Sequence, residues 1–378
     1  MAQNTDTNKA PVSQRYIGRF AQISIYFGKF LRMFIYQNDW KVLPIAAVIA
    51  GLVGMVIKGS FNITREGTLM GSLAVACVCL WNGCFNSIQV ICRERPIVKR
   101  EHHSGMYISS YVLAHLLFQA IICVLQSVIT IYILKAMGVK FPDSGLVMDF
   151  FEAEFFITLF VVTFSADMMS LFISSLVHTT TAAMTLMPFI LIFQLIFSGG
   201  MFAIPQNLKP ICNFTISNYG IRTIASEMHY NEQPVITGWN TLYNMRNTEI
   251  NFTTTVDQVL QLINRQDNEL TLNLNQKEIS DDYTVSDLIE AVMELPDYGA
   301  AGDREIPIRF TINDLINLVG PQKAMELVTE KTSGSGAISE YVSTEENVKK
   351  SWTKLMIIAA GFTVLTMVSL SIVDKDKR

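Results

Sequence analysis

Six charged side chains of both signs lie within nine residues of this chain, in a pattern suited to contact with a soluble partner: Arg93, Glu94, Arg95, Lys99, Arg100 and Glu101. Long apolar runs flank this block, so we expect a short connector in water, and its basic excess predicts the cytoplasmic side of a membrane. Charges of both signs fix the register of a protein contact better than apolar side chains do. The alternative is an ordinary basic loop that only sets membrane topology.

Three amide side chains occur at helical spacing in the apolar run before this block. Asn82, Asn86 and Gln89 are separated by four and three residues, which places them on one side of a helix. Polar groups at membrane depth must face protein or a water-filled path. Two interpretations stay open: these amides line a substrate path, or they form hydrogen bonds between helices.

One carboxylate, Asp167, lies deep within a later apolar run. It stands about 15 Å from the inner end of that run at the rise of an α-helix. A carboxylate at membrane depth is a candidate for function by default. We favour a structural role here, with a partner such as His115 or Gln119 on the preceding run.

Aromatic and methionine side chains dominate the fifth apolar run, with Phe189, Phe193 and Phe197 spaced four residues apart and Met187 and Met201 near them. Adaptable surfaces of this kind suit hydrophobic ligands. The pattern therefore predicts a substrate-facing helix, and the alternative is a helix that packs against protein or lipid.

The composition indicates a polytopic helical membrane protein. Half of the 378 residues are hydrophobic and only 16% are charged, whereas soluble domains carry about a quarter charged residues. Apolar runs near the ~20 residues that cross a bilayer predict six transmembrane helices, at 42–57, 67–92, 106–137, 150–177, 180–205 and 352–373. Six crossings place both termini on one side, which we expect to be the cytoplasm, in the plasma (inner) membrane.

Two segments outside these runs complete the predicted organisation. Within residues 1–41, apolar side chains at helical spacing and scattered basic residues predict an amphipathic helix over 15–38 that lies on the inner leaflet. A poorly apolar transmembrane helix is the alternative. Residues 42–230 then form the first five transmembrane helices, and 351–378 the sixth with a basic tail.

Residues 231–350 are predicted to form a small α+β domain outside the cell. This segment contains 20 acidic and 9 basic side chains, while the rest of the chain is net basic. Thr255 and Gln258 have the spacing of a capping box that opens a helix. Residues 306–312 alternate like a strand, and 321–330 have a helical pattern.

The element order and two groups of motifs resemble the membrane subunit of G-type ABC exporters, which has the type V exporter fold and an ABC-2 type membrane domain. The first group is Glu94-Arg95 and Arg100-Glu101, then Tyr107 and Tyr111-Val112-Leu113-Ala114. The second is Phe197-Ser198-Gly199-Gly200-Met201-Phe202, Ile204-Pro205 and Asn218-Tyr219-Gly220. The resemblance covers roughly 15–230 and 352–373. The long insertion departs from it, so the role of that segment cannot be transferred.

The resemblance implies a transport subunit rather than an enzyme. Residues 93–105 would be the coupling helix, and the second and fifth transmembrane helices of two copies would line the substrate route. No Gly-x-x-x-x-Gly-Lys-Ser/Thr phosphate loop occurs in the sequence, so ATP and Mg are expected on a partner ATPase. The other expected partners are membrane lipids and a hydrophobic or amphipathic substrate exported from the cytoplasm or inner leaflet, and no nucleic acid.

Two other function classes remain open from sequence. A secondary transporter would show paired intramembrane charges and internal repeats, and Asp167 is the only deeply placed acid. A non-transporting scaffold or sensor would act through residues 231–350. Copurification of an ATPase separates the exporter from both.

Overall fold

The computed structural model divides the chain into two compact units. It describes residues 18–202, 204–264, 278–280, 283–284, 289–291, 294, 302–333 and 338–372. The first unit, called the helical unit here, is Met1–Gln233 with Gly336–Arg378, and the second is Pro234–Ser335. Residues 336–350 were predicted to be part of the insertion, but they belong to the helical unit. The basic C-terminal tail and the start of the predicted amphipathic helix lie outside the described residues.

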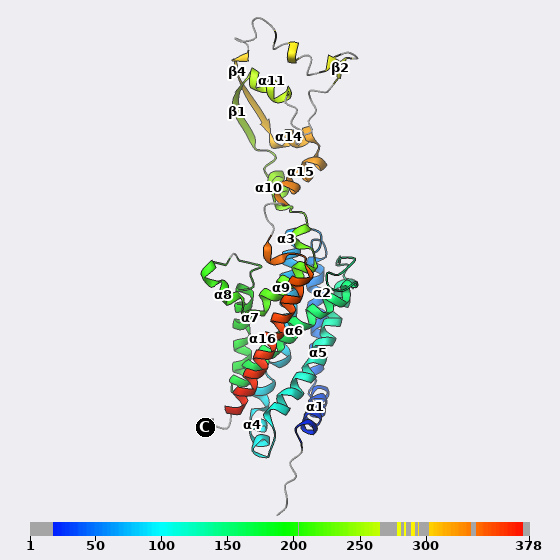
Figure 1. Ribbon diagram of the computed structural model, residues 1–378, viewed down its shortest axis with the longest axis vertical. Coiled ribbons are helices and arrows are strands. Elements are labelled where there is room, and N and C mark those ends of the chain that lie inside the picture. The colour runs from blue at the N-terminus through cyan, green and yellow to red at the C-terminus, as the bar shows by residue number, and fades with distance from the viewer. Residues whose placement is uncertain are drawn as a thin grey trace, which may run out of the picture. The chain divides into compact units, whose positions relative to one another are not determined.

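The helical unit is a bundle of long helices joined by short segments (Figure 1). Its elements are α1 (Arg19–Tyr36), η1 (Asp39–Lys41), α2 (Val42–Ile57), α3 (Arg65–Ser87), α4 (Val90–His103), α5 (Ile108–Ala136), α6 (Phe151–Leu176), α7 (Thr180–Ile196), η2 (Gln206–Leu208), α8 (Lys209–Cys212), α9 (Ile216–Glu227), η3 (Tyr230–Glu232), η5 (Ser339–Tyr341) and α16 (Glu345–Ile372).

Five helical segments among the described residues are long and apolar enough to cross a membrane. They are Asp39–Ile57, Arg65–His103, Ile108–Ala136, Phe151–Leu176 and Glu345–Ile372. The chain is therefore a multi-pass helical membrane protein. The predicted fifth transmembrane helix is shorter than expected, because α7 ends at Ile196 rather than near 205. Gly199 follows with φ +75°, a left-handed conformation that an α-helix cannot contain and that glycine tolerates.

Helix α6 is the centre of the bundle, with α3 and α16 making its most extensive contacts. Gly83 of α3 allows the close approach to α6. A Cβ atom there would lie 2.8 Å from both Ala166 Cβ and Asp167 N, and nearer still to the Thr163 carbonyl oxygen. Only a residue without a side chain fits, so α3 and α6 are in near backbone contact at this level.

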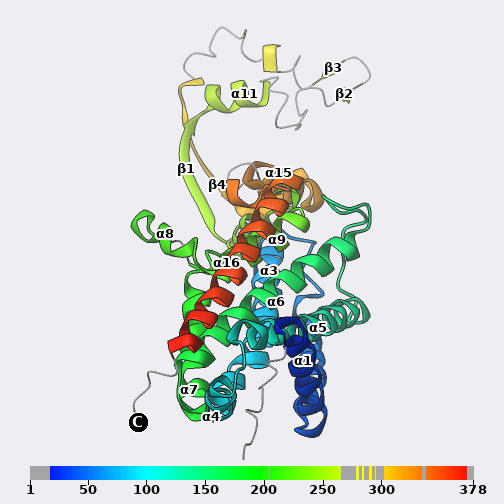
Figure 2. The same ribbon diagram turned by 60° about the horizontal axis from the view of Figure 1, so that its bottom comes forward.

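The amphipathic helix α1 packs along α5, as Figures 1 and 2 both show. Phe30 is buried and stacks on His115 with ring centroids 3.7 Å apart. Gln22 donates to the Gly105 carbonyl at 3.1 Å and accepts from the Tyr107 amide at 2.9 Å. One face of α1 is thus held by the segment that joins α4 to α5.

The second unit combines short helices with two small antiparallel sheets. Its elements are α10 (Thr237–Asn244), β1 (Glu249–Thr255), α11 (Val256–Asn264), β2 (Glu278–Ser280), β3 (Tyr283–Thr284), β4 (Glu305–Thr311), α14 (Ile312–Val319) and α15 (Pro321–Ser333). Strand β1 pairs with β4 from Glu249↔Thr311 to Thr255↔Glu305. The predicted capping box is present: the Thr255 and Gln258 amides each donate to the other residue's side chain, both at 3.4 Å.

Candidate functional site

The charged block forms most of α4, which lies at the same end of the helical unit as the C-terminal end of α16 (Figure 1). Two contacts attach this helix to α6. Ser174 Oγ accepts from the Ile91 and Cys92 amides at 3.1 and 3.2 Å. Arg95 Nη1 donates to the Ser175 carbonyl at 2.9 Å. Helix α4 is therefore a fixed extension of the bundle rather than a loose loop.

Glu94 is the one member of the block that is buried. Its carboxylate accepts from the Tyr111 hydroxyl at 3.2 Å and lies 3.6 Å from Lys29 Nζ. Glu101 lies 3.5 Å from the same ammonium group. Glu94 thus joins α4 to α1 and α5 and is not placed at a surface for direct contact with a soluble partner.

The other basic residues of the block differ in their surroundings. Arg93 forms an ion pair with Asp39 at 3.2 Å, and both side chains are partly exposed. Lys99 is half-buried and Arg100 is exposed. The exposed positions of α4 recur at spacings of three or four residues and so form one face, called the α4 face here: Arg93, Pro96, Ile97, Arg100 and His103.

A titratable side chain near this end responds to the charge of the two glutamates. The pKa of Tyr26 on α1 is raised, first by burial and then by the negative charge of Glu101. Glu94 adds to this effect. Both carboxylates of α4 thus act on a side chain of α1.

Asp167 is fully buried and hydrogen-bonded between helices. It accepts from Ser87 Oγ on α3 and from Cys123 Sγ on α5, the latter at 3.4 Å. Gln119 Nε2 donates to Ser87 Oγ at 3.0 Å, so Gln119 is one bond away. The expected direct partners, His115 and Gln119, are not its partners, because Ser87 and Cys123 are the groups beside the carboxylate.

The three predicted amides have different surroundings, and Gln89 lies beyond the end of α3, at the start of α4. Asn82 is buried. Asn86 exchanges two hydrogen bonds with Gln126 of α5, at 2.8 and 3.0 Å. Gln89 is half-buried and lines a cavity with Asn86. Asn86 therefore has the helix-joining role, while Gln89 is the member best placed to reach a ligand.

The aromatic residues of α7 do not share that cavity with the amides. Phe189 and Phe193 are 66% and 44% exposed, and Phe193 contacts Phe197 with centroids 4.8 Å apart. Within one chain, the structure does not join the six predicted substrate-path residues into a single site.

Sequence reasoning missed the contribution of α1 to this region. Gln22 and Lys29 are seven residues apart, and both bind the segment around α4. Their spacing places two polar residues on the same face of an otherwise apolar helix surface. That was the available signal for a protein-facing rather than a purely lipid-facing helix.

Another buried acidic group, Glu227, lies at the end of α9. The Thr158 hydroxyl donates to Glu227, and Trp352 Nε1 donates to Thr158 Oγ1 at 2.7 Å. Burial, outweighing the Thr158 hydrogen bond and reinforced by the charge of Glu154, raises the pKa of Glu227 well above its usual range. This group ties α9, α6 and α16 together.

Comparison with protein families gives a match to the ABC-2 type transporter model over residues 23–223. That is more than half of the chain, and it spans every element from most of α1 to most of α9. The chain belongs to the ABC-2 type transporter family. The predicted resemblance to G-type ABC exporters is confirmed, and the second unit lies outside the matched residues.

Two relatives of this ABC-2 type membrane protein are similar at low identity. One is an ABC transporter ATP-binding/permease protein of Mycobacterium tuberculosis, 25% identical over 195 residues. The other is ABC transporter G family member 4 of Arabidopsis thaliana, 25% identical over 187 residues. Each match covers 48% of this chain but only 22% and 31% of the relatives' lengths. The chain is thus similar to one part of each relative.

Proposed function

We propose that this chain is the membrane subunit of an ATP-driven exporter, coupled to a separate ATPase through residues 93–105. ATP and Mg would bind to that partner. The substrate would be amphipathic or lipid-like and would leave the cytoplasm or the inner leaflet. Family membership supports the transport role, and the observation that carries the coupling role is the exposed face of a fixed, charged α4.

The contacts of α4 suit it to transmit force. Its exposed face offers Arg93 and Arg100 to a partner, while Arg95 and Glu94 on other sides hold α6 and α5. A displacement of the face would move α5 and α6 with it, since Glu94 and Arg95 bond directly to those helices. We therefore assign partner contact to the α4 face and force transmission to Glu94 and Arg95.

The proposed topology has six crossings. The five long segments are joined in this topology by α7, the fifth crossing in chain order, whose 17 residues extend about 25 Å at helical rise, near the lower limit for a bilayer. This arrangement places both termini and α4 in the cytoplasm and the second unit outside, in the plasma membrane. The exposed basic residues of α4 support this orientation.

A second copy of the chain would complete the substrate route. Met70, Trp81 and Phe85 of α3 are exposed, as are Phe189 and Phe193 of α7. Large apolar side chains exposed on membrane helices face lipid or another subunit. We propose that α3 and α7 of two copies face each other and line the substrate route. Asn82, Gln89 and Phe197 would then lie nearer to that route than their burial in a single chain suggests.

ATP hydrolysis by the complex purified from native membranes tests this function. We expect an ATPase to copurify with the wild-type chain and to be lost, or to hydrolyse ATP without substrate stimulation, after Arg100→Glu. Lys140→Glu is the matched control, because Lys140 is exposed beyond the opposite end of α5. Absence of a copurifying ATPase, or equal effects of the two reversals, would contradict the proposal.

A further inference from the structure

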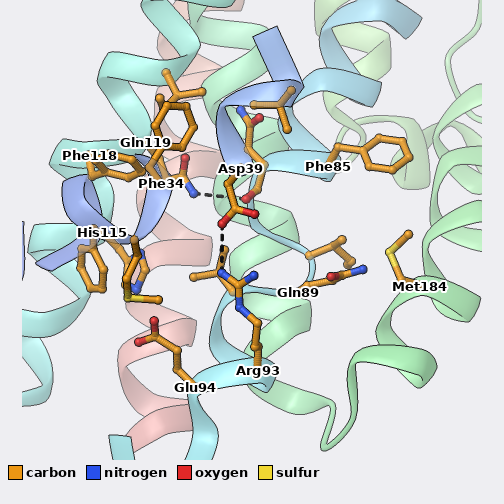
Figure 3. Close-up of a pocket in the computed structure, with 17 residues that line it drawn as sticks. Phe34, Asp39, Phe85, Gln89, Arg93, Glu94, His115, Phe118, Gln119 and Met184 are labelled. Carbon is orange, nitrogen blue, oxygen red and sulfur yellow. Dashed lines mark hydrogen bonds and ion pairs between the residues drawn. The ribbon is translucent and has the colours of Figure 1, made fainter. Parts of the chain in front are cut away.

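A cavity of about 250 Å³ lies between α1, the start of α2, the junction of α3 and α4, and α5. Figure 3 shows His115, Phe118 and Phe34 on one side, Phe85 and Met184 on the other, and Arg93 and Glu94 near its charged end. Its wall is thus apolar and aromatic over most of its surface, with polar side chains at several points around it. That is the usual composition of a site for a small organic ligand.

Two buried polar side chains in this wall have hydrogen-bonding capacity that no described residue uses. Glu94 and His115 are each 2% exposed. Glu94 Oε1 and both ring nitrogens of His115 have no hydrogen-bond partner within the described part of the chain. Tyr111 brings them together, since its hydroxyl binds Glu94 and its ring contacts the His115 ring at 4.8 Å. Unsatisfied buried polar atoms are costly and call for a partner.

Charged side chains of both signs lie around the cavity. Asp39 and Arg93 pair with each other at 3.2 Å. The remaining carboxylates, Glu94 and Glu101, share the single ammonium group of Lys29. Glu94, which lines the cavity, therefore shares this cation with Glu101, at a position where burial makes an incompletely paired carboxylate unfavourable.

We propose that this cavity binds an amphipathic primary amine. Its ammonium group would donate to Glu94 Oε1 and to a ring nitrogen of His115. Its apolar part would lie against Phe34, Phe118 and Ile122, and aromatic rings near the cation add further attraction. A carboxylate or phosphate head is disfavoured, because its oxygens would face those of Glu94.

This site would add a ligand class to the exporter described above. Only the biological role of the site rests on the proposed export function. Asn86 of α3 and Gln89 at the start of α4 form part of the same wall, so an amine bound here would lie next to the proposed route. Binding itself needs neither an ATPase nor ATP. Failure of binding would therefore leave the export proposal intact, and failure of export would leave the site intact.

Equilibrium dialysis of the full-length chain in lipid nanodiscs tests the site with three probes of one shape: 4-phenylbutylamine, 4-phenylbutan-1-ol and 4-phenylbutanoate. Empty nanodiscs provide the background for partition into lipid. We expect saturable binding of the amine, one per chain, and at least about tenfold weaker binding of the other two, because each loses a charge-assisted hydrogen bond. Equal binding of all three would refute the proposal.

Matched variants locate the bound amine. Ile122→Phe places a larger ring in the cavity wall, whereas Ile121→Phe adds the same ring at a neighbouring position that is 48% exposed. We expect the first to abolish amine binding and the second to leave it unchanged. His115→Phe keeps the ring on Phe30 but removes both nitrogens, and should weaken binding several-fold.

Glu94→Gln should weaken amine binding at least about tenfold. Since Glu94 also joins helices, the variant is assessed only if its thermal unfolding matches the wild-type chain; otherwise the Ile122 and Ile121 pair decides. Amine binding that Ile122→Phe and His115→Phe leave unchanged would overturn the assignment.

Discussion

Replacement of Gly83 by alanine should destabilise the helical unit more than its size suggests. The added Cβ would lie 2.8 Å from Ala166 Cβ and Asp167 N, whereas ordinary van der Waals contact begins at 3.4 Å. Helices α3 and α6 must therefore separate by more than half an ångström, and the Thr163 carbonyl requires more. Protein interiors do not absorb such a shift freely. Overpacking of this kind costs about 1–3 kcal/mol.

Thermal unfolding in detergent, followed with a thiol-reactive dye, measures this effect, since Cys79, Cys84 and Cys123 are buried. We expect Gly83→Ala to lower the midpoint by roughly 2–12 °C at the scale of a domain of this size. Gly361→Ala is the control, because a Cβ there meets nothing within 4 Å, and alanine is the better helix former. Equal midpoints for Gly83→Ala and the wild-type chain would refute the close-approach account.

Two further predictions concern the other acidic and capping groups. Burial, reinforced by Glu154, raises the pKa of Glu227 in the folded protein. The contribution of Glu227 to the free energy of unfolding is therefore fully present below its unfolded pKa of about 4.3 and is lost as the pH rises through the folded pKa. Glu227→Gln should therefore raise the unfolding midpoint at pH 8 and do so less at pH 5, and a gain independent of pH would contradict this. Thr311 caps α14, since its hydroxyl accepts from the Asp314 amide at 3.2 Å. Thr311→Ala should cost about 1 kcal/mol, seen as faster hydrogen exchange of α14 amides in the full-length chain, whereas unchanged exchange would show that the cap is dispensable.

Hydropathy predicted most of the helical unit because long apolar runs leave the backbone few alternatives in a membrane. The first predicted helix, 42–57, coincides with α2, and α5 and α6 differ from prediction by one or two residues at each end. The predicted end of α7 was wrong, because the apolar run continues past Gly199 and hydropathy does not detect the left-handed backbone there. The start of α16 was also misplaced, because Glu345 to Ser351, which are polar except for Val348, continue the helix.

The candidate site was less predictable than the fold. A glutamate in a charged block is expected to face water, but Glu94 is buried because Lys29 and Tyr111, far away in sequence, provide its partners. The partner of Asp167 depends on how α3, α5 and α6 are rotated against one another, which periodicity alone does not fix. The cavity beside His115 arises only when α1 packs on α5.

Photocrosslinking from α4 tests the central claim most directly. Arg100, on the exposed α4 face, is replaced by p-benzoylphenylalanine in the native host, with Lys140 replaced in parallel. The account predicts a covalent adduct from position 100 to a protein that mass spectrometry shows to contain a Gly-x-x-x-x-Gly-Lys phosphate loop, and none from position 140. Adducts to that protein from position 140 alone, or from neither position while an ATPase copurifies, would contradict coupling through α4.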